Sequence, residues 1–209
     1  AQSDKTDLGC HTGTISDAFL ELYQAGKLTN AHKELDTGLS AWNLAMGSQE
    51  LYDWLDAEPQ LFHPGDLDYI HSVERISKFS NVISINGGVQ LDLMGQENAE
   101  STGTRQLSGV GGQMDFLEGA YRPKGGKGFI CINSSRVTKD GERKSNILAT
   151  IPGGSTISAP RTMIQYVATE YGIASLSGKT LRERAEAMAS IAHPDFREEL
   201  MKYAQENFK

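Results

Sequence analysis

The chain has 209 residues, a formal net charge of −7, and 38% hydrophobic and 22% charged residues. Its length can bury a substantial core, and its composition is typical of a soluble globular α/β protein. The negative charge argues against nucleic acid or an anionic membrane as partner, and no apolar run approaches the roughly 20 residues that span a bilayer. With two cysteines and five scattered histidines, we predict no disulfide framework, no metal site and a reduced, cytoplasmic setting.

The first part of the chain predicts two helices separated by a strand. Residues 16–25 place apolar side chains on one face and end at Gly26, and residues 48–57 repeat this pattern before Pro59. Between them, alternating apolar residues predict a strand over 39–46 that leads into the second helix. This order of strand and helix is typical of an α/β fold.

The middle of the chain predicts a series of short strands. Apolar and polar residues alternate on both sides of the Asn-Gly-Gly sequence at 86–88, which predicts a β-hairpin over 82–93. Glycine-containing turns at 139–141 and 152–154 separate the later segments. Further strands are expected at 128–133, 146–151, 155–158 and 164–169.

The C-terminal segment is expected to be helical. Thr180 and Glu183 match a capping box ahead of residues with helical spacing, and Pro194 suits the first position of a last helix. We find no internal repeat and no linker long enough to separate two domains. The sequence therefore predicts one α/β domain over residues 1–209, with an open mixed sheet and flanking helices.

The strongest functional signal is the segment at 108–116, which reads Ser-Gly-Val-Gly-Gly-Gln-Met-Asp-Phe. Its glycines let the backbone adopt positive φ and approach a ligand closely. Successive N–H groups in such a turn form a concavity that binds an anion or a developing oxyanion. A tight turn without a ligand is the alternative, because a lone glycine cluster is a weak signal.

Four segments resemble motifs of the acetyl-CoA hydrolase and 4-hydroxybutyrate CoA-transferase family, the family I CoA-transferases. They are residues 108–116, 167–172 (VATEYG), 178–185 (GKTLRERA) and 191–200 (IAHPDFREEL). The resemblance extends from Asp7 to about Leu200. Family members have two related α/β halves with the active site between them, and this chain resembles the C-terminal half alone. The resemblance therefore implies a second chain that resembles the N-terminal half as partner, unless the chain is a cut or truncated product.

The family reaction moves CoA between carboxylic acids, so the resemblance implies acyl-CoA and a small carboxylic acid as substrates, with no further cofactor. In the family, a glutamate of the motif L-G-x-H-T-E attacks the acyl-CoA and then carries CoA as a thioester. Here residues 8–13 read LGCHTG, so Gly13 occupies the position of the nucleophile. Where the family usually has D-Y-x-N-D-P, His71 replaces the asparagine. These departures imply glutamate-free chemistry, either thioester hydrolysis or β-keto acyl-CoA cleavage, with His71 as a general base.

The glycine turn matches the family's oxyanion-binding apparatus. By resemblance, Gly112 is the expected donor of a backbone N–H group to the thioester oxygen. The residues expected to contact the acyl-CoA or its phosphates are Gly109, Gly111, Gln113, Lys124 and Lys127. For the two lysines, a solvated surface loop is the alternative.

Two further residues carry reactive side chains. Cys10 lies beside His11, but neighbouring strand residues point to opposite faces, so we do not expect them to form a nucleophile–base pair. Glu170 lies in the matching motif at 167–172. We expect it to be a structural hydrogen-bonding carboxylate rather than a displaced nucleophile.

Three interpretations of function stay open at this point. The first is an active acyl-CoA-processing subunit, paired with a chain that supplies the other half. The second is a non-catalytic subunit that binds acyl-CoA or supports an active paralogue. The third is an ordinary CoA-transferase fragment whose glutamate has been substituted. The two departures at Gly13 and His71 argue against the third interpretation, because a single substitution is enough to inactivate the enzyme. The intact glycine turn argues mildly against the second.

Overall fold

The computed structural model describes residues 4–208, which form two compact units. Within the described chain, unit 1 comprises residues 4–82 and 122–126, and unit 2 comprises residues 83–121 and 127–208. The single domain expected over 1–209 stays a prediction, because two compact units can belong to one domain. Residues 1–3 and 209 of that range lie outside the described part. No helix within residues 4–208 combines the length and the apolar character needed to cross a membrane.

Unit 1 is built on a three-stranded parallel sheet in the order β1-β2-β3. Its strands are β1 (His11–Ile15), β2 (Ser40–Ala45) and β3 (Phe62–Pro64). Its helices are α1 (Asp17–Gln24), α2 (Gln49–Ala57), the 3₁₀ turn η1 (Pro59–Leu61), α3 (Leu67–Ile70) and α4 (Val73–Ile76). The helices predicted at 16–25 and 48–57 and the strand predicted at 39–46 are confirmed. Ser48 begins α2 because its side chain accepts a hydrogen bond from the N–H group of Leu51.

The core of unit 1 lies between α1, α2 and the sheet. Leu20, Leu51 and Trp54 are the buried residues of the two helices. Trp54 contacts Phe62 of β3 edge to face, with ring centroids 4.8 Å apart. The helical spacing of these apolar residues is what holds both helices on one face of the sheet.

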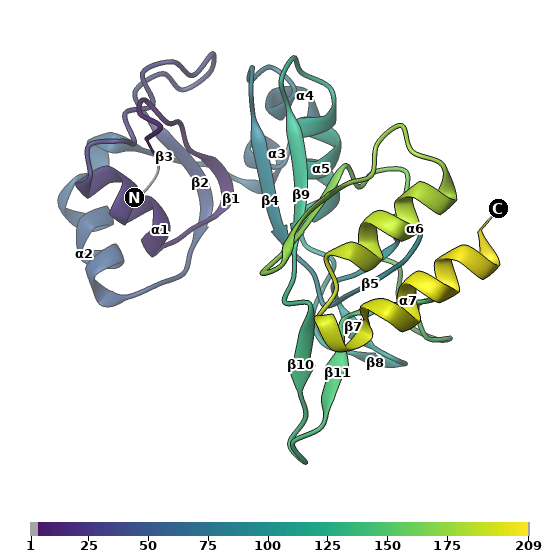
Figure 1. Cartoon of the computed structure of the whole chain (residues 1–209). Coiled ribbons are helices and arrows are strands. Elements are labelled where there is room, and N and C mark those ends of the chain that lie inside the picture. Colours follow the sequence, from purple (N-terminus) through teal and green to yellow (C-terminus); the bar gives the residue numbers. More distant parts are fainter. Residues whose placement is uncertain (1–3, 209) are drawn as a thin grey trace. The chain divides into compact units, whose positions relative to one another are not determined.

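Unit 2 contains a four-stranded sheet in the order β14-β13-β9-β4. The strands are β4 (Ile83–Gly87), β9 (Lys127–Cys131), β13 (Tyr166–Thr169) and β14 (Gly172–Ser175). The first three run parallel and β14 runs antiparallel, so the sheet is mixed, as predicted. The helices of unit 2 are α5 (Gln113–Tyr121), α6 (Leu181–Ser190) and α7 (Pro194–Asn207), the last two side by side (Figure 1).

Shorter strands complete unit 2. A three-stranded sheet joins β12 (Ile147–Leu148), β5 (Gln90–Asp92) and β6 (Glu97–Asn98). Two-stranded ribbons join β7 (Ser101–Thr102) to β8 (Arg105–Gln106) and β10 (Ser135–Val137) to β11 (Arg143–Ser145). The β10–β11 ribbon extends away from the rest of unit 2 as an arm (Figure 1).

The hairpin predicted over 82–93 is wrong. β4 pairs with β9, whereas β5 pairs with β6 and β12, so the two strands belong to different sheets. A type I′ turn requires positive φ at both central residues, and neither Gly87 nor Gly88 has it. Gly88 serves close packing instead, since a Cβ atom there would lie 2.9 Å from Oε1 of Glu97.

Other strand predictions had mixed outcomes. The strands at 128–133 and 164–169 are confirmed, but the one at 146–151 shrinks to the two residues of β12. The strand at 155–158 is wrong, because that segment is irregular, with a turn at 153–154 before it and a single bridge between Ala159 and Glu97 after it. The turn at 139–141 is confirmed, and it closes the β10–β11 arm, which the pattern did not predict.

The C-terminal helices follow the prediction closely. Thr180 and Glu183 form both hydrogen bonds of the capping box at the start of α6. Pro194 is the first residue of α7. These signals are local in sequence, and the structure confirms both of them.

Arg184 ties α6 to the rest of unit 2. Its side chain is buried and donates to three backbone carbonyl oxygens. The acceptors are Met94 at 2.8 Å, Leu176 at 2.8 Å and Arg161 at 2.7 Å. One side chain thus joins three loop segments that are distant in sequence.

The Arg184→Met variant is expected to lower the free energy of unfolding by about 3–5 kcal/mol, because three buried carbonyl groups lose a charged donor. Urea denaturation of the purified protein measures this loss. The matched control is Arg182→Met, which removes only the exposed pair with Glu186 on the same helix and should cost less than about 1 kcal/mol. Equal effects of the two substitutions would contradict the anchoring role.

Candidate functional site

The glycine turn, defined as residues 109–112, is held at both ends. Before it, the N–H group of Leu107 donates to the carbonyl oxygen of Glu100 at 2.7 Å. After it, the N–H group of Phe116 donates to the carbonyl oxygen of Gly112 at 3.2 Å, which is the first hydrogen bond of α5. The turn therefore leads directly into the N-terminus of a nine-residue helix.

Between these two anchors, the backbone N–H groups of residues 109–112 donate no hydrogen bond to any residue that the structure describes. Gly111 has a φ of +61°, a left-handed conformation that favours glycine, whereas Gly112 does not have positive φ. A Cβ atom at Gly109 or Gly111 would meet nothing within 4 Å. Unpaired N–H groups at a helix N-terminus, in a turn with open space beside Gly109 and Gly111, are suited to a negatively charged oxygen.

Gln113, expected to contact the acyl-CoA, makes a different contact in the structure. Its Nε2 donates to Oε1 of Glu97 at 3.1 Å, across the start of α5. Glu97 lies on β6 and is fully buried. Burial raises the pKa of Glu97 to about 7, the hydrogen bond from Gln113 opposes this rise, and the nearby Glu100 adds to it. The pattern missed Glu97, because a glutamate in a polar run carries no local sign of burial.

The two lysines lie on exposed parts of the chain. Lys127 is the first residue of β9, and Lys124 lies in the loop that belongs to unit 1. The nine residues of α5 span about 13 Å, and Lys127 follows the C-terminal end of that helix while the turn precedes its N-terminal end. Lys127 is therefore not part of the immediate surroundings of the turn, and contact with CoA phosphates stays a prediction for both lysines.

Gly13 lies in the middle of β1, between the strand pairs that Thr12 and Thr14 form with β2. His11 lies two residues earlier, with its Nε2 2.8 Å from the carbonyl oxygen of Ile70. Burial lowers the pKa of His11 to about 4, although that carbonyl oxygen favours the charged form. At neutral pH His11 is therefore an uncharged imidazole whose Nε2–H donates to Ile70.

His71, the predicted general base, follows the C-terminal end of α3. Its backbone N–H donates to the carbonyl oxygen of Leu67 at 2.8 Å and closes that helix. His71 belongs to unit 1 and Gly112 belongs to unit 2. A site shared by these two residues stays a prediction.

The structure supports the expectations for Cys10 and Glu170. Burial raises the pKa of the Cys10 thiol to about 12, although Lys33 opposes this, so Cys10 holds no thiolate at neutral pH. Glu170 accepts hydrogen bonds from the backbone N–H and the hydroxyl of Ser134, at 2.9 and 2.6 Å. Both residues therefore have structural roles.

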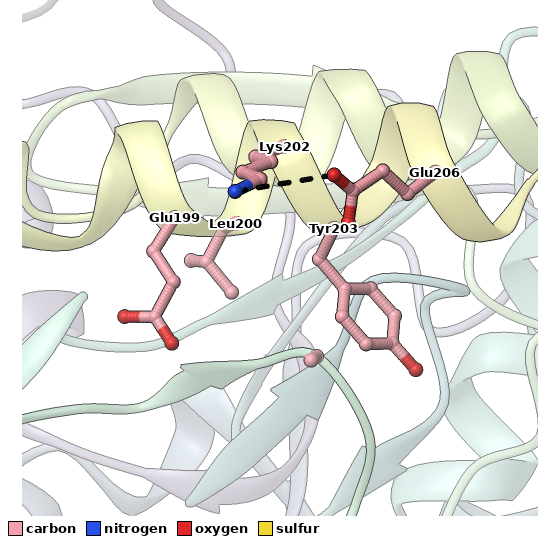
Figure 2. A pocket seen from close by; sticks show the side chains of 6 residues that line it. Glu199, Leu200, Lys202, Tyr203 and Glu206 are labelled. Atoms are coloured by element: carbon pink, nitrogen blue, oxygen red, sulfur yellow. Dashed lines mark ion pairs between the residues drawn. The ribbon is translucent and has the colours of Figure 1, made fainter.

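A cavity of about 170 Å³ lies beside α7, lined by Ala149, Glu199, Leu200, Lys202, Tyr203 and Glu206. Figure 2 shows Leu200 and Tyr203 projecting from one side of the helix, with Lys202 and Glu206 paired 4.0 Å apart. None of the predicted site residues lines this cavity. It is separate from the glycine turn, and we assign it no chemistry.

Comparisons with known proteins give consistent results. Residues 47–204 match the family described as the acetyl-CoA hydrolase/transferase C-terminal domain. The butyryl-CoA:acetate CoA-transferase of Anaerostipes caccae is 43% identical over 205 residues, which cover 98% of this chain and 46% of that protein. The chain thus spans about half the length of the curated relatives that it matches.

Two solved structures resemble this one. RipA from Yersinia pestis matches with a TM-score of 0.87 and 38% identity, over 97% of this chain and 45% of that one. The 4-hydroxybutyrate CoA-transferase from Porphyromonas gingivalis matches with a TM-score of 0.80 and 36% identity, over 97% and 46%. These neighbours confirm the predicted fold class, an open α/β half with a mixed sheet.

Proposed function

Because this chain belongs to the acetyl-CoA hydrolase/transferase family, we propose that it is the acyl-CoA-processing half of a CoA-transferase-like enzyme. The observation that carries this proposal is the glycine turn, whose N–H groups are unpaired within the described chain and which has open space beside Gly109 and Gly111. By analogy with the butyryl-CoA:acetate and 4-hydroxybutyrate enzymes, the substrates are an acyl-CoA and a small carboxylic acid.

The turn supports binding of a thioester carbonyl group. The N–H group of Gly112 donates to the thioester oxygen, and the positive end of the α5 dipole favours negative charge at the same point. The left-handed conformation of Gly111 shapes the backbone ahead of that donor. Charge that develops on the oxygen during nucleophilic attack is therefore stabilised by the backbone alone.

Glutamate-free chemistry at this carbonyl follows from Gly13. In hydrolysis, a water molecule gives a proton to His71, and the water oxygen bonds to the carbonyl carbon of the thioester. The C–S bond then breaks, CoA leaves as the thiolate, and the products are CoA and the carboxylic acid. Cleavage of a β-keto acyl-CoA would use the same oxyanion donor. His71 has the side-chain chemistry for the base, and Lys124 and Lys127 could contact the CoA phosphates.

A non-catalytic role is the second candidate, and Gly13 is the observation that favours it. Neither of the neighbouring reactive groups replaces the missing nucleophile, because Cys10 is protonated and buried and the His11 ring is held against Ile70. Such a subunit would bind acyl-CoA at the turn without turning it over. A substituted fragment of an ordinary CoA-transferase would behave in the same way.

The four-stranded sheet supports the proposal of a partner. Ile83, Ile85 and Ile173 are 56%, 71% and 63% exposed. Strand register places them on one face of the sheet, because directly paired residues share a face and so do residues two apart on one strand. Ile85 on β4 pairs with Phe129, which pairs with Tyr166 on β13, and Ala168, two residues after Tyr166, pairs with Ile173 on β14. An apolar sheet face of this kind is suited to a covering partner. We assign it to a polypeptide that resembles the half of the relatives that this chain does not match. A cytoplasmic setting is part of the same proposal.

We expect this chain to bind acetyl-CoA and to form a defined complex only when it is co-expressed with such a polypeptide. Light scattering after size-exclusion chromatography measures the complex. Ile85→Lys should abolish it, because a charge would be buried in an apolar interface, whereas Ile157→Lys at another exposed apolar position should not. A well-behaved monomer that binds acetyl-CoA tightly by itself would contradict the proposal.

A further inference from the structure

Glu97 has a carboxyl group that the proposed chemistry does not use and that contacts Gln113, the residue that follows the glycine turn. Both backbone polar groups of Glu97 are bonded to one neighbouring segment, since its N–H donates to Ala159 at 3.0 Å and its carbonyl oxygen accepts from Ser158 at 2.8 Å. Its side chain is fully buried. The carboxyl group therefore cannot reach solvent without local unfolding of β6.

The two carboxyl oxygens have unequal surroundings. Oε1 accepts the hydrogen bond from Gln113, while Oε2 has no hydrogen-bond partner within residues 4–208. Gly88 closes the space beside Oε1, because a Cβ atom there would lie 2.9 Å away. Leu91 of β5, which pairs with Glu97, and Ser158 and Ala159, which bond its backbone, carry no ionisable group. Glu100 is the charged group that acts on Glu97.

These surroundings favour the neutral acid. A buried carboxylate with one neutral donor and one unpaired oxygen is far more costly than a buried carboxylic acid. Accordingly, burial and Glu100 raise the pKa of Glu97 to about 7, against the hydrogen bond from Gln113. The neutral and the ionised form of Glu97 are both accessible near neutral pH, and they differ in the hydrogen bonds that they require from Gln113.

We infer that Glu97 is a positioning residue for the glycine turn. Its neutral carboxyl group seats the first residue of α5 through Gln113, and thereby aims the N–H group of Gly112, which is one peptide bond away. On ionisation, Oε2 requires a donor, and the Gln113 amide and the adjoining turn move to supply it. The inference rests on the proposed thioester-binding role of the turn.

The first test needs no ligand and uses the whole chain, in complex with its partner where the complex forms. Backbone amide resonances of Gly109, Gly111 and Gly112 are followed by NMR from pH 5 to pH 9. Shifts with a midpoint near pH 7 are expected in the wild type and are expected to vanish in Glu97→Gln, which keeps the acceptor and cannot ionise. The exposed-residue control Glu142→Gln should keep them. The inference would be overturned if the wild-type resonances showed no such titration, or if the titration persisted in Glu97→Gln.

The second test measures acetyl-CoA affinity over the same pH range. Above pH 7 the wild-type affinity is expected to fall, by up to about tenfold per pH unit, as the neutral form is depleted. Glu97→Gln should bind with little pH dependence, and Glu97→Leu, which loses the contact with Gln113, should bind weakly at every pH. Equal affinity in all three variants would refute the positioning role. If the wild type binds no acetyl-CoA at any pH, the proposed function fails, while the NMR titration still decides the role of Glu97.

Discussion

The Gly112→Val variant is expected to turn over acyl-CoA about a hundred to a thousand times more slowly than the wild-type complex. Loss of one oxyanion donor removes roughly 3–4 kcal/mol of transition-state stabilisation, and a branched side chain at the turn keeps the thioester oxygen away from the N–H group. Gly112 does not have positive φ, so a side chain there imposes no left-handed strain. The carbonyl group that starts α5 is retained.

The fold should therefore survive this substitution, and the measurement must separate binding from stability. Thiol release from acetyl-CoA gives the turnover, while urea denaturation and co-purification with the partner report the fold. Gly153→Val is the matched control, because Gly153 also lies in a loop of unit 2, lacks positive φ and has open space around it. Near-normal turnover in Gly112→Val would make the turn structural and would favour the non-catalytic interpretation.

The helices could be predicted because their signals are local. Ser48, the Thr180–Glu183 capping box and Pro194 each act within one turn of the helix that they begin. Apolar periodicity then places the remaining residues on the buried face. The structure matches these boundaries to within about one residue.

Strand pairing could not be predicted in the same way, because it depends on distant segments. The Asn-Gly-Gly sequence resembles a hairpin turn, yet Gly88 is needed because Glu97, Ile130 and Ile132 approach it closely. A local pattern cannot distinguish a glycine that turns the chain from one that admits a neighbour. The β10–β11 arm was missed because its strands are only three residues each.

The candidate site also has a local part that could be predicted and a part made by distant residues that could not. Its backbone part, the glycine turn, is contiguous in sequence and could be predicted, and Gly111 has the positive φ that such a turn permits. Its side-chain part could not, because the contact between Gln113 and Glu97 joins a helix start to a strand 16 residues earlier. Burial of a carboxyl group follows from tertiary packing, which the residue pattern around Glu97 does not encode.

The chemistry at position 13 can be tested by restoring a nucleophile. A glutamate there would attack the carbonyl carbon of acetyl-CoA, break the C–S bond and release CoA thiolate, leaving an acetyl-glutamyl anhydride. The thiolate would then attack the glutamyl carbonyl carbon and release acetate, which leaves CoA on the chain as a thioester. Gly13 lies within β1, between Thr12 and Thr14, which both pair with β2, so a side chain placed there is held by a regular strand.

The wild-type complex is expected to show no CoA-sized adduct on this chain after incubation with acetyl-CoA, whereas Gly13→Glu is expected to gain one. Intact mass measurement detects the adduct, and its loss on treatment with borohydride or hydroxylamine identifies a thioester. Gly13→Gln is the matched control, because it has nearly the same size and no nucleophilic oxygen. Transfer activity should stay low in Gly13→Glu, since His71 still occupies the asparagine position. An adduct on the wild-type chain at Glu170, or at any other carboxylate, would show that the nucleophile has moved rather than been lost.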